Sequence, residues 1–309
     1  MEFDVIGDIH GQAGKLDDLL SKLGYTQSGP LWVPPQGKQA VFVGELIDRG
    51  PEQVRVIDTV RRMIDAGFAL SVMGNHEFNA IGYVTRKRGR DGKFLRKHSP
   101  TNVAQHAVFL RQVGEGSALH KDLVHWFRTL PPFLDLGGIR VVHAWWHQPH
   151  IKTVTARMAP GHAMDDEFLH LAYDKANPEW AAMEGLTKGL EIRLPDGHSF
   201  RDHGNVERHE VRTKWWLHDA ANYNDVAILP MSHMNRLPEI RLPETYSPES
   251  ITGSPVFVGH YWLSGRPVVQ TQKVACLDYS AAKDGPLVAY RWSGEESLSN
   301  ENFVLSEFQ

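Results

Sequence analysis

Side chains that are typical metal ligands recur in five short stretches of the chain. GDIHG (7–11) and GELIDRG (44–50) combine carboxylates with a histidine or an arginine. GNHE (74–77) adds an amide and a second histidine, while VVHA (141–144) and VGH (258–260) each contain one histidine. Carboxylate, imidazole and amide groups together suit Mn, Fe or Zn better than Ca or Mg, which prefer oxygen ligands. The residue types therefore predict a metal site.

Each stretch alone also fits a polar loop that satisfies its own backbone. GDIHG could be an ordinary turn, and GNHE could be the capped start of a helix. All five, however, coincide with the end of an apolar run, so a purely structural explanation would have to hold five times independently. Two ions about 3.5–4 Å apart, bridged by one carboxylate, could activate water for attack on phosphorus. The joint pattern favours such a dinuclear site.

This chemistry requires elements that bring the stretches together. The apolar pattern predicts strands at 3–6, 40–43 and 68–73, each followed by one of the first three stretches. Leucines at helical spacing predict a helix that Gly24 ends, and Pro51 suits the first turn of the next helix. Ligands bind at the carboxyl ends of strands in open α/β sheets, so we expect the stretches to meet at one edge.

The rest of the chain supplies further elements. We expect helices at 103–113 and 119–129 and a hairpin at 133–142 around Gly137. Three later strands are expected at 255–258, 274–279 and 287–290. Residues 25–38 are expected to form a loop around Trp32. The basic segment 84–100 fits a solvated loop better than an arm that binds anions.

Residues 145–254 differ from the rest in composition. Trp, His, Pro and charged residues are frequent there, and strand patterns are short. We therefore expect one domain with the core 1–144 and 255–309, and a cap-like insertion over the site. Histidines within 198–219 could line a substrate pocket, although a histidine without a partner at ligand spacing more often has a structural role.

The overall composition is that of an ordinary globular protein. The 309 residues carry 33 Lys and Arg against 37 Asp and Glu, a formal net charge of -4. This balance gives no reason to expect general binding of nucleic acid or an anionic membrane. No apolar run approaches the roughly 20 residues of a membrane helix, and the acidic beginning argues against a secretory signal. With Cys276 as the single cysteine, a reducing, cytoplasmic location is expected.

As an ordered set, the five stretches resemble the signature of the calcineurin-like metallophosphoesterases. The resemblance is strongest to the phosphoprotein-phosphatase type, which includes bacterial serine/threonine phosphatases and symmetrical diadenosine tetraphosphatases. It covers both ends of the chain and leaves out residues 145–250. It implies an α/β (α+β) fold, a β-sandwich flanked by helices, and two divalent metal ions. Mn is the ion expected first, with Fe or Zn as alternatives.

The resemblance also implies a role for each polar residue of the stretches. Asp8 and His10 would bind the first ion, and Glu45 would bridge the two. The second ion would be bound by three side chains from the other stretches, namely Asn75, His143 and His260. No covalent phosphoenzyme is implied, because the attacking group is metal-activated water.

Three further residues would serve the reaction itself. His76 would be the general acid that protonates the leaving oxygen, and Asp48 would orient it through a hydrogen bond. Arg49 would bind the phosphate through its planar guanidinium group. These assignments also follow from the resemblance.

The chain departs from the family pattern at two places. The family has Asp at the position of Glu45, which is one methylene longer and could displace a metal, lower its occupancy or change the preferred ion. Protein phosphatases of this type commonly have two glycines close after the residue that matches His143, where this chain has Trp145 and Trp146. These rings could narrow a substrate groove or pack in the core, and the sequence favours neither.

The sequence favours an enzyme that hydrolyses phosphomonoesters, with phosphoproteins or small phosphorylated metabolites as candidate substrates. One alternative is a symmetrical dinucleoside tetraphosphate hydrolase, in which residues 86–97 hold extra phosphates and four tryptophans stack bases: Trp145, Trp146, Trp215 and Trp216. A third hypothesis is a metal-poor binding or regulatory protein that Glu45 has inactivated. It ranks below the enzymes because the proposed acid, its orienting carboxylate and the phosphate-binding arginine are all present.

Overall fold

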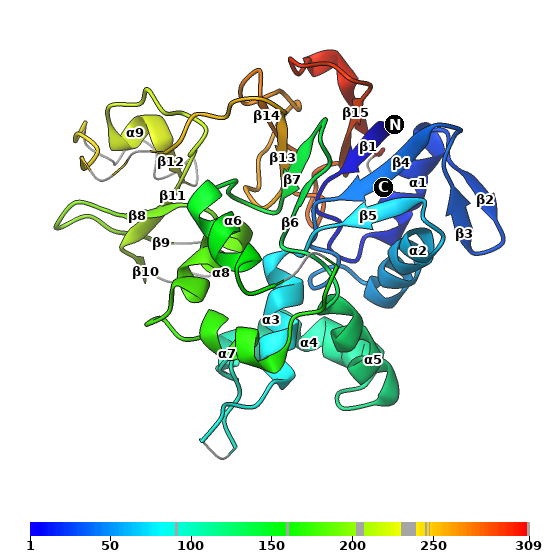
Figure 1. The fold of residues 1–309 in the computed structure, drawn as a ribbon, viewed down its shortest axis with the longest axis horizontal. Helices are drawn as coiled ribbons and strands as arrows, with labels where there is room; N and C mark the ends of the chain where they lie inside the picture. Colours follow the sequence, from blue (N-terminus) through cyan, green and yellow to red (C-terminus); the bar gives the residue numbers. More distant parts are fainter. Residues whose placement is uncertain are drawn as a thin grey trace.

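Two β-sheets form the centre of the molecule (Figure 1). The computed structural model describes residues 1–89, 92–158, 161–201, 207–229, 239–244, 246 and 248–307. The first sheet has the strand order β16-β15-β1-β4-β5, with bounds Phe303–Leu305, Val288–Trp292, Glu2–Ile6, Lys38–Phe42 and Ala69–Ser71. The second has the order β14-β13-β7-β6, with bounds Val274–Cys276, Val256–Val258, Arg140–Val142 and Phe133–Asp135.

Successive residues of the central strands face two different apolar clusters. Val5 and Val41 belong, with Phe257 of the other sheet, to the cluster between the sheets. Their chain neighbours Ile6 and Phe42 face the opposite way, into a larger cluster that includes the helices. Because side chains alternate along a strand, both faces of this sheet are buried. The expected β-sandwich flanked by helices is confirmed.

Helices α1 (Ala13–Lys22) and α2 (Gln53–Asp65) lie beside the first sheet in Figure 1. Their buried leucines, valines and isoleucine recur at helical spacing and join Ile6 and Phe42 in the larger cluster. Gly24 follows α1 with a φ of +85°, a left-handed conformation that favours glycine. Both predicted helices are confirmed.

Helices α3 (Asn75–Val84), α4 (Pro100–Val113) and α5 (Ala118–Phe127) form a group at the bottom of Figure 1. The helices expected at 103–113 and 119–129 correspond to α4 and α5. The Ser99 side chain accepts a hydrogen bond from the backbone of Asn102 and so caps α4. The basic segment before α4 contains a bridge between Arg86 and Phe94, and its residues 90 and 91 lie outside the described chain.

One expected loop is wrong. Residues 25–38 contain a hairpin of β2 (Thr26–Ser28) and β3 (Leu31–Val33). Trp32 is buried in the larger cluster, and β3 contacts α2. A strand of three residues around one buried ring has too short a pattern to be recognised in the sequence. The edge strand β16 was missed for the same reason.

The described residues between 145 and 254 form two structurally different parts. In the first, helices α6 (Gln148–Thr155), α7 (Asp166–Ala172) and α8 (Pro178–Lys188) contribute to the larger apolar cluster. The second forms two small sheets, with strands β8 (Glu191–Arg193), β11 (Glu210–Thr213), β12 (Ala227–Ile228), β9 (Phe200–Arg201) and β10 (Glu207–Arg208). The sheet β12-β11-β8 and the short helix α9 (Tyr223–Val226) have a small cluster of their own.

The four tryptophans considered for base stacking are buried in the larger cluster, with exposed fractions of 8, 4, 0 and 5% for Trp145, Trp146, Trp215 and Trp216. Core packing accounts for these rings, and a base-stacking role for them is wrong. Part of the tract 198–219, residues 202–206, lies outside the described chain. Among the described helices, none has the length and hydrophobicity needed to cross a membrane.

Candidate metal centre

Five strands, β1, β4, β5, β7 and β13, lead into the stretches that carry the candidate ligands, and several of the resulting loops pack backbone against backbone. The carbonyl of Glu45 accepts hydrogen bonds from the backbone N–H groups of Ile9 and His10 at 3.1 and 2.7 Å. A Cβ atom on Gly44 would lie 2.4 Å from the nitrogen of Gly74, so only glycine permits this approach. The glycines of the stretches therefore hold the loops at one edge of the sandwich.

Several residues of these loops have left-handed backbone conformations. The φ angles are +48° at His10, +59° at Glu45, +65° at Asp48, +73° at Arg49 and +71° at His260. Such conformations cost on the order of 1 kcal/mol or more for a residue with a side chain. Their concentration in these loops indicates that the positions of the side chains are set by function rather than by local preference.

Glu77 holds two of these loops together. Its carboxylate accepts hydrogen bonds from the backbone N–H groups of Glu45 (3.0 Å), Leu46 (2.8 Å) and Gly74 (3.0 Å). Glu77 is itself fully buried. The sequence placed Glu77 in GNHE, but its partners on the 44–50 loop became visible only in the structure.

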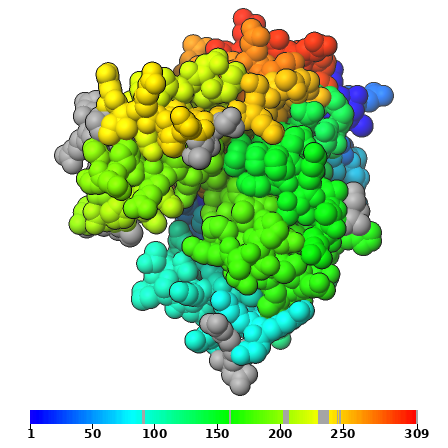
Figure 2. Space-filling model, turned by 60° about the vertical axis from the view of Figure 1, so that its left-hand side comes forward, coloured from blue at the N-terminus to red at the C-terminus, as the bar shows by residue number. Residues whose placement is uncertain are grey.

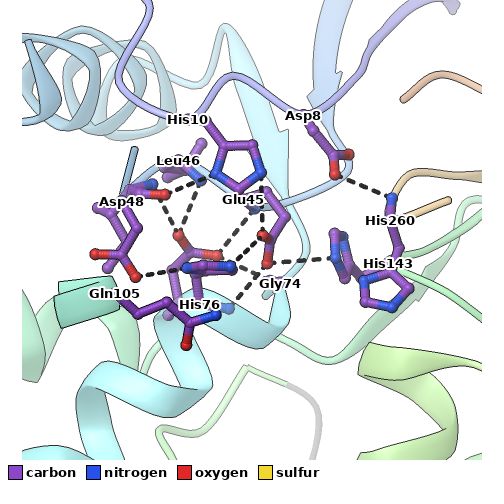
Figure 3. A network of polar contacts seen from close by, with 12 residues as sticks. Asp8, His10, Glu45, Leu46, Asp48, Gly74, His76, Gln105, His143 and His260 are labelled. Atoms are coloured by element: carbon purple, nitrogen blue, oxygen red, sulfur yellow. Dashed lines mark hydrogen bonds and ion pairs between the residues drawn. The ribbon is translucent and has the colours of Figure 1, made fainter. Parts of the chain in front are cut away.

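Glu45 lies in the middle of the candidate ligands (Figure 3). Its Oε2 atom is 3.4 Å from His10 Nε2 and 3.3 Å from His76 Nε2, and its Oε1 atom is 3.3 Å from His143 Nε2. Two groups of ligand atoms, each within 4.8 Å, share this residue: His10–Glu45–His76 and Asp8–Glu45–His143. A carboxylate that faces two ligand groups is the arrangement a bridging ligand requires.

The grouping differs in detail from the pairs implied by the resemblance. Asp8 groups with His143 rather than with His10, and His76 lies beside His10. The backbone N–H of His260 donates to Asp8 Oδ2 at 3.0 Å, which keeps these two loops in contact. All the candidate ligands are nevertheless buried around Glu45, with exposed fractions between 0 and 9%.

Two of the candidate histidines are oriented as metal ligands usually are. His10 Nδ1 donates to the carbonyl of Ile47 at 2.9 Å, and His143 Nδ1 donates to the carbonyl of Val43 at 2.7 Å. Each bond places the proton on Nδ1 and leaves the Nε2 lone pair directed to the site. Burial lowers the pKa of His143 to about 3 and that of His10 well below its usual value, so both rings stay neutral.

Unpaired polar atoms show that the residues fit metal ions. Within the described chain, four buried ligand atoms form no hydrogen bond: Asp8 Oδ1, Asn75 Oδ1, His143 Nε2 and His260 Nε2. Such atoms are rare in folded proteins because each costs free energy. Burial also raises the pKa of Asp8, further raised by Asp278 and Glu45, and that of Glu45 to about 7. Divalent cations would stabilise the ionised carboxylates and supply the missing partners.

Asp48 and His76 form a hydrogen-bonded pair beside these ligands. His76 Nδ1 donates to Asp48 Oδ2 at 2.5 Å, and His106 Nδ1 donates to Asp48 Oδ1 at 2.9 Å. Burial opposes ionisation of Asp48, but the two hydrogen bonds hold its pKa well below the usual range. Burial also opposes protonation of His76, but the charge of Glu45 and the bond to Asp48 raise its pKa. A protonated His76 is what a general acid requires.

Arg49 lies on an aromatic ring that the sequence did not single out. Its guanidinium carbon is 3.6 Å from the centroid of the Trp262 ring, and Lys283 Nζ is 4.8 Å from the same ring. Stacking of this kind fixes the plane of a guanidinium group. Two cations on one ring near the site can attract a phosphate group.

Asp278 is a further buried carboxylate that sequence reasoning missed. It accepts hydrogen bonds from the backbone N–H groups of Trp262 (2.7 Å) and Ser280 (3.0 Å). Asp278 follows the apolar run that contains β14 (Val274–Cys276). The pattern that identified the other loops, a carboxylate at the end of a strand, was therefore present in the sequence. By holding Trp262, Asp278 helps to place the ring under Arg49.

Comparison with known sequences identifies the family. The sequence model of the calcineurin-like phosphoesterases matches residues 1–180, more than half of the chain. The chain belongs to this family. The matched range includes four of the five stretches, and His260 lies beyond it.

Related proteins carry a more specific name. The chain is 41% identical over 160 residues to the Bacillus subtilis protein named bis(5'-nucleosyl)-tetraphosphatase PrpE [asymmetrical], which covers 51% of this chain and 63% of that protein. A protein of the same name from Oceanobacillus iheyensis is 29% identical over 144 residues, covering 47% and 55%. The chain spans less than two thirds of the length of these curated relatives.

Solved structures are similar only at a low level. A cold-active protein-tyrosine phosphatase of a Shewanella species aligns with a TM-score of 0.48 and 16% identity, covering 99% of this chain and 80% of that one. A protein serine/threonine phosphatase from Saccharomyces cerevisiae aligns with a TM-score of 0.49 and 13% identity, covering 100% and 80%. A likeness of this degree says nothing about the substrate.

Proposed function

We propose that this protein is a phosphoester hydrolase that uses two divalent metal ions. The observation that carries the proposal is the position of Glu45, whose two oxygens face two separate groups of buried ligand atoms. Bound there, the ions would act as Lewis acids and activate water for attack on phosphorus. Membership of the calcineurin-like phosphoesterases supports this reaction class.

The ligand set and the reacting residues are part of the proposal. Glu45 would be shared by the two ions, and the other side chains that would hold them are Asp8, His10, Asn75, His143 and His260. His76 donates a proton to the leaving oxygen as the phosphorus–oxygen bond breaks, and Asp48 keeps the imidazole protonated and oriented. Arg49, stacked on Trp262, binds the non-bridging phosphate oxygens.

Mn is proposed as the first of the candidate ions, with Fe and Zn as competitors. The donor set mixes imidazole nitrogen with carboxylate and amide oxygen, which suits these three ions better than Ca or Mg. Metal-free protein titrated with each ion in turn, followed by metal analysis and assay, would rank them. The highest activity with Mg alone would contradict this part of the proposal.

Phosphomonoesters of proteins or small metabolites are the first candidate substrates. Dinucleoside tetraphosphates are the second, because the relatives carry the name of a tetraphosphatase and because Arg49 and Lys283 share one ring. The names of the relatives specify asymmetrical cleavage, whereas the sequence resemblance suggested the symmetrical reaction.

Assays with Mn on three substrates would test the proposal: p-nitrophenyl phosphate, a phosphopeptide and diadenosine tetraphosphate. Hydrolysis of the first two supports a phosphomonoesterase. Exclusive turnover of the third replaces it with a tetraphosphatase, and the products distinguish symmetrical cleavage (ADP alone) from asymmetrical cleavage (ATP and AMP). Less than one metal per chain, with no turnover after Mn is added, would instead favour a binding or regulatory protein.

We also propose a single domain, with the core 1–144 and 255–309 and an insertion at about 145–254 that borders the site. Figure 2 shows a hollow between the yellow-green part of the insertion and the cyan and green segments, with blue atoms of the N-terminal part at its bottom. This hollow is the proposed path for the phosphorylated substrate. The cytoplasmic location stays a proposal based on cysteine usage.

A further inference from the structure

We propose that His106, on helix α4, is a positioning residue for the general acid: it holds Asp48 and thereby fixes the direction of His76. This inference rests on the proposed hydrolase function. The Asp48 carboxylate uses one oxygen for each imidazole, Oδ2 for His76 (2.5 Å) and Oδ1 for His106 (2.9 Å). All three residues are buried, with exposed fractions of 5% or less.

Two imidazoles on opposite oxygens fix a carboxylate better than one does. With His76 alone, the carboxylate could rotate about its last side-chain bond, and the imidazole plane would turn with it, because this torsion is broad in Asp. The bond from His106 removes that rotation. The direction of His76 Nε2, the atom that gives up the proton, is then set by helix α4.

The backbone on both sides of Asp48 is anchored to α4 as well. The Asp48 N–H donates to Gln53 Oε1 at 2.9 Å, and Gln53 Nε2 donates to the carbonyl of Gly50 at 3.1 Å. The Gln53 N–H in turn donates to Gln112 Oε1 at 2.9 Å. Helix α4 therefore reaches the 48–50 turn directly through His106 and indirectly through Gln112.

His106 packs against two aromatic rings and has one hydrogen-bond partner among the described residues. Its ring centroid is 5.2 Å from that of Tyr83 and 4.9 Å from that of Phe109. Its Nδ1 donates to Asp48, while its buried Nε2 forms no hydrogen bond. A histidine that only filled this space would have no need of a ring nitrogen, since an apolar ring would pack here without an unpaired atom. The bond to Asp48 accounts for the histidine.

Leaving-group dependence distinguishes positioning of an acid from a packing role. His106→Phe keeps a ring but removes the donor, and His106→Asn restores a donor near the position of Nδ1. Loss of general-acid catalysis slows a poor leaving group more than a good one, because the poor one needs the proton as its bond breaks. The variants are compared on phenyl phosphate, a poor leaving group, and p-nitrophenyl phosphate, a good one.

We expect His106→Phe to lower kcat on phenyl phosphate about 10-fold more than on p-nitrophenyl phosphate, a fraction of the 10²–10⁴-fold that a general acid contributes. KM and metal content should not change. His106→Asn should recover most of the kcat that His106→Phe loses on phenyl phosphate. The matched control is His120→Phe, a buried histidine on α5 that also lies beside Phe109 and does not contact Asp48. Equal losses on both substrates, or no loss, would overturn the proposal.

A second readout does not depend on turnover. In the metal-free protein, the proton between His76 Nδ1 and Asp48 should give a downfield ¹H NMR resonance. His106→Phe should broaden or shift this resonance, and His120→Phe should leave it in place. An unchanged resonance in His106→Phe would contradict the positioning role. If the wild type hydrolyses neither aryl phosphate, phosphomonoester hydrolysis is excluded from the proposed function, and the NMR comparison alone decides the role of His106.

Discussion

Polar side chains are buried in one region of the molecule and exposed in another. The first region is the strand-end loops at 7–11, 44–50 and 74–77, and the second is the small sheet β12-β11-β8. In the loops, the candidate ligands are buried, and the glycines allow backbone contacts closer than any side chain would permit. In the small sheet, Arg212 pairs with Glu191 at 3.2 Å, and both side chains are more than a third exposed. Neither group of ligand atoms found in the described chain includes a residue from 145–254.

The difference shows that a high local number of histidines is not sufficient to form a metal site. The insertion is rich in histidine, yet the candidate ligands come from loops whose backbone is held by Glu77 and by left-handed turns. A ligand atom needs burial and a fixed direction, and these depend on the loops around it. Matched variants in the two regions test this contrast.

His76→Asn is expected to have the largest effect. Loss of the general acid should lower kcat by about 10²–10⁴-fold on a poor leaving group. The matched change in the small-sheet region, His209→Asn, alters an exposed side chain and should change kcat less than about 2-fold. Steady-state kinetics with Mn measures both. Comparable losses in the two variants would remove the contrast between the regions.

Glu77→Gln should show the contrast in stability. The change replaces an acceptor of several backbone N–H groups with an amide that also presents donors to them. We expect a loss of about 2–4 kcal/mol in the free energy of unfolding. Glu191→Gln breaks an exposed ion pair and should cost less than about 0.5 kcal/mol. Urea unfolding of the metal-free proteins measures the difference, and similar values for both variants would be contrary to the account.

Helix α6 offers a pH-dependent test, because it lies within 145–254 but packs in the larger apolar cluster. Burial, with the nearby charge of His147, lowers the pKa of His150 to about 4, from an ordinary value of about 6.5. Between these values the unfolded chain binds a proton that the folded chain does not, so this group destabilises the fold as the pH falls from 6.5 towards 4. Above pH 6.5 the contribution is absent.

His150→Leu should therefore reduce the fall in Tm between roughly pH 7 and pH 5 by about 2–4 °C, allowing for the partial exposure of the ring. The exposed His125 is the control, and His125→Leu should leave the pH dependence unchanged. Thermal unfolding followed by circular dichroism gives both curves. Parallel curves for wild type and His150→Leu would show that His150 does not titrate differently on folding.

Glu45→Asp should have the smallest effect. It restores the residue expected from the family resemblance, so activity with Mn should be similar or up to a few-fold higher. Activity and metal content are measured together. A large loss of either would show that the loops of this protein are built around the longer glutamate and that the implied bridging geometry is wrong.

The family resemblance carried by the five stretches was sufficient to predict the sandwich. The residue types at the ends of the apolar runs were sufficient to predict that the candidate ligands meet at one edge. The hairpin at 26–33 and β16 were missed because strands of three residues leave no readable period.

Residues that act through partners far along the chain could not be predicted. His106 bonds to a residue 58 positions away, and Trp262 lies under Arg49 through contacts made only in the folded chain. No local pattern specifies such pairs. Strands β9 and β10 have two residues each and pair with one another, and strands this short leave no readable period in the sequence.

Anomalous diffraction from crystals grown with Mn²⁺ tests the central claim most directly. The account predicts two peaks about 3.5–4 Å apart, with the Glu45 carboxylate between them and ligands from the five stretches around them. A single peak, or two peaks without contact to Glu45, would contradict it.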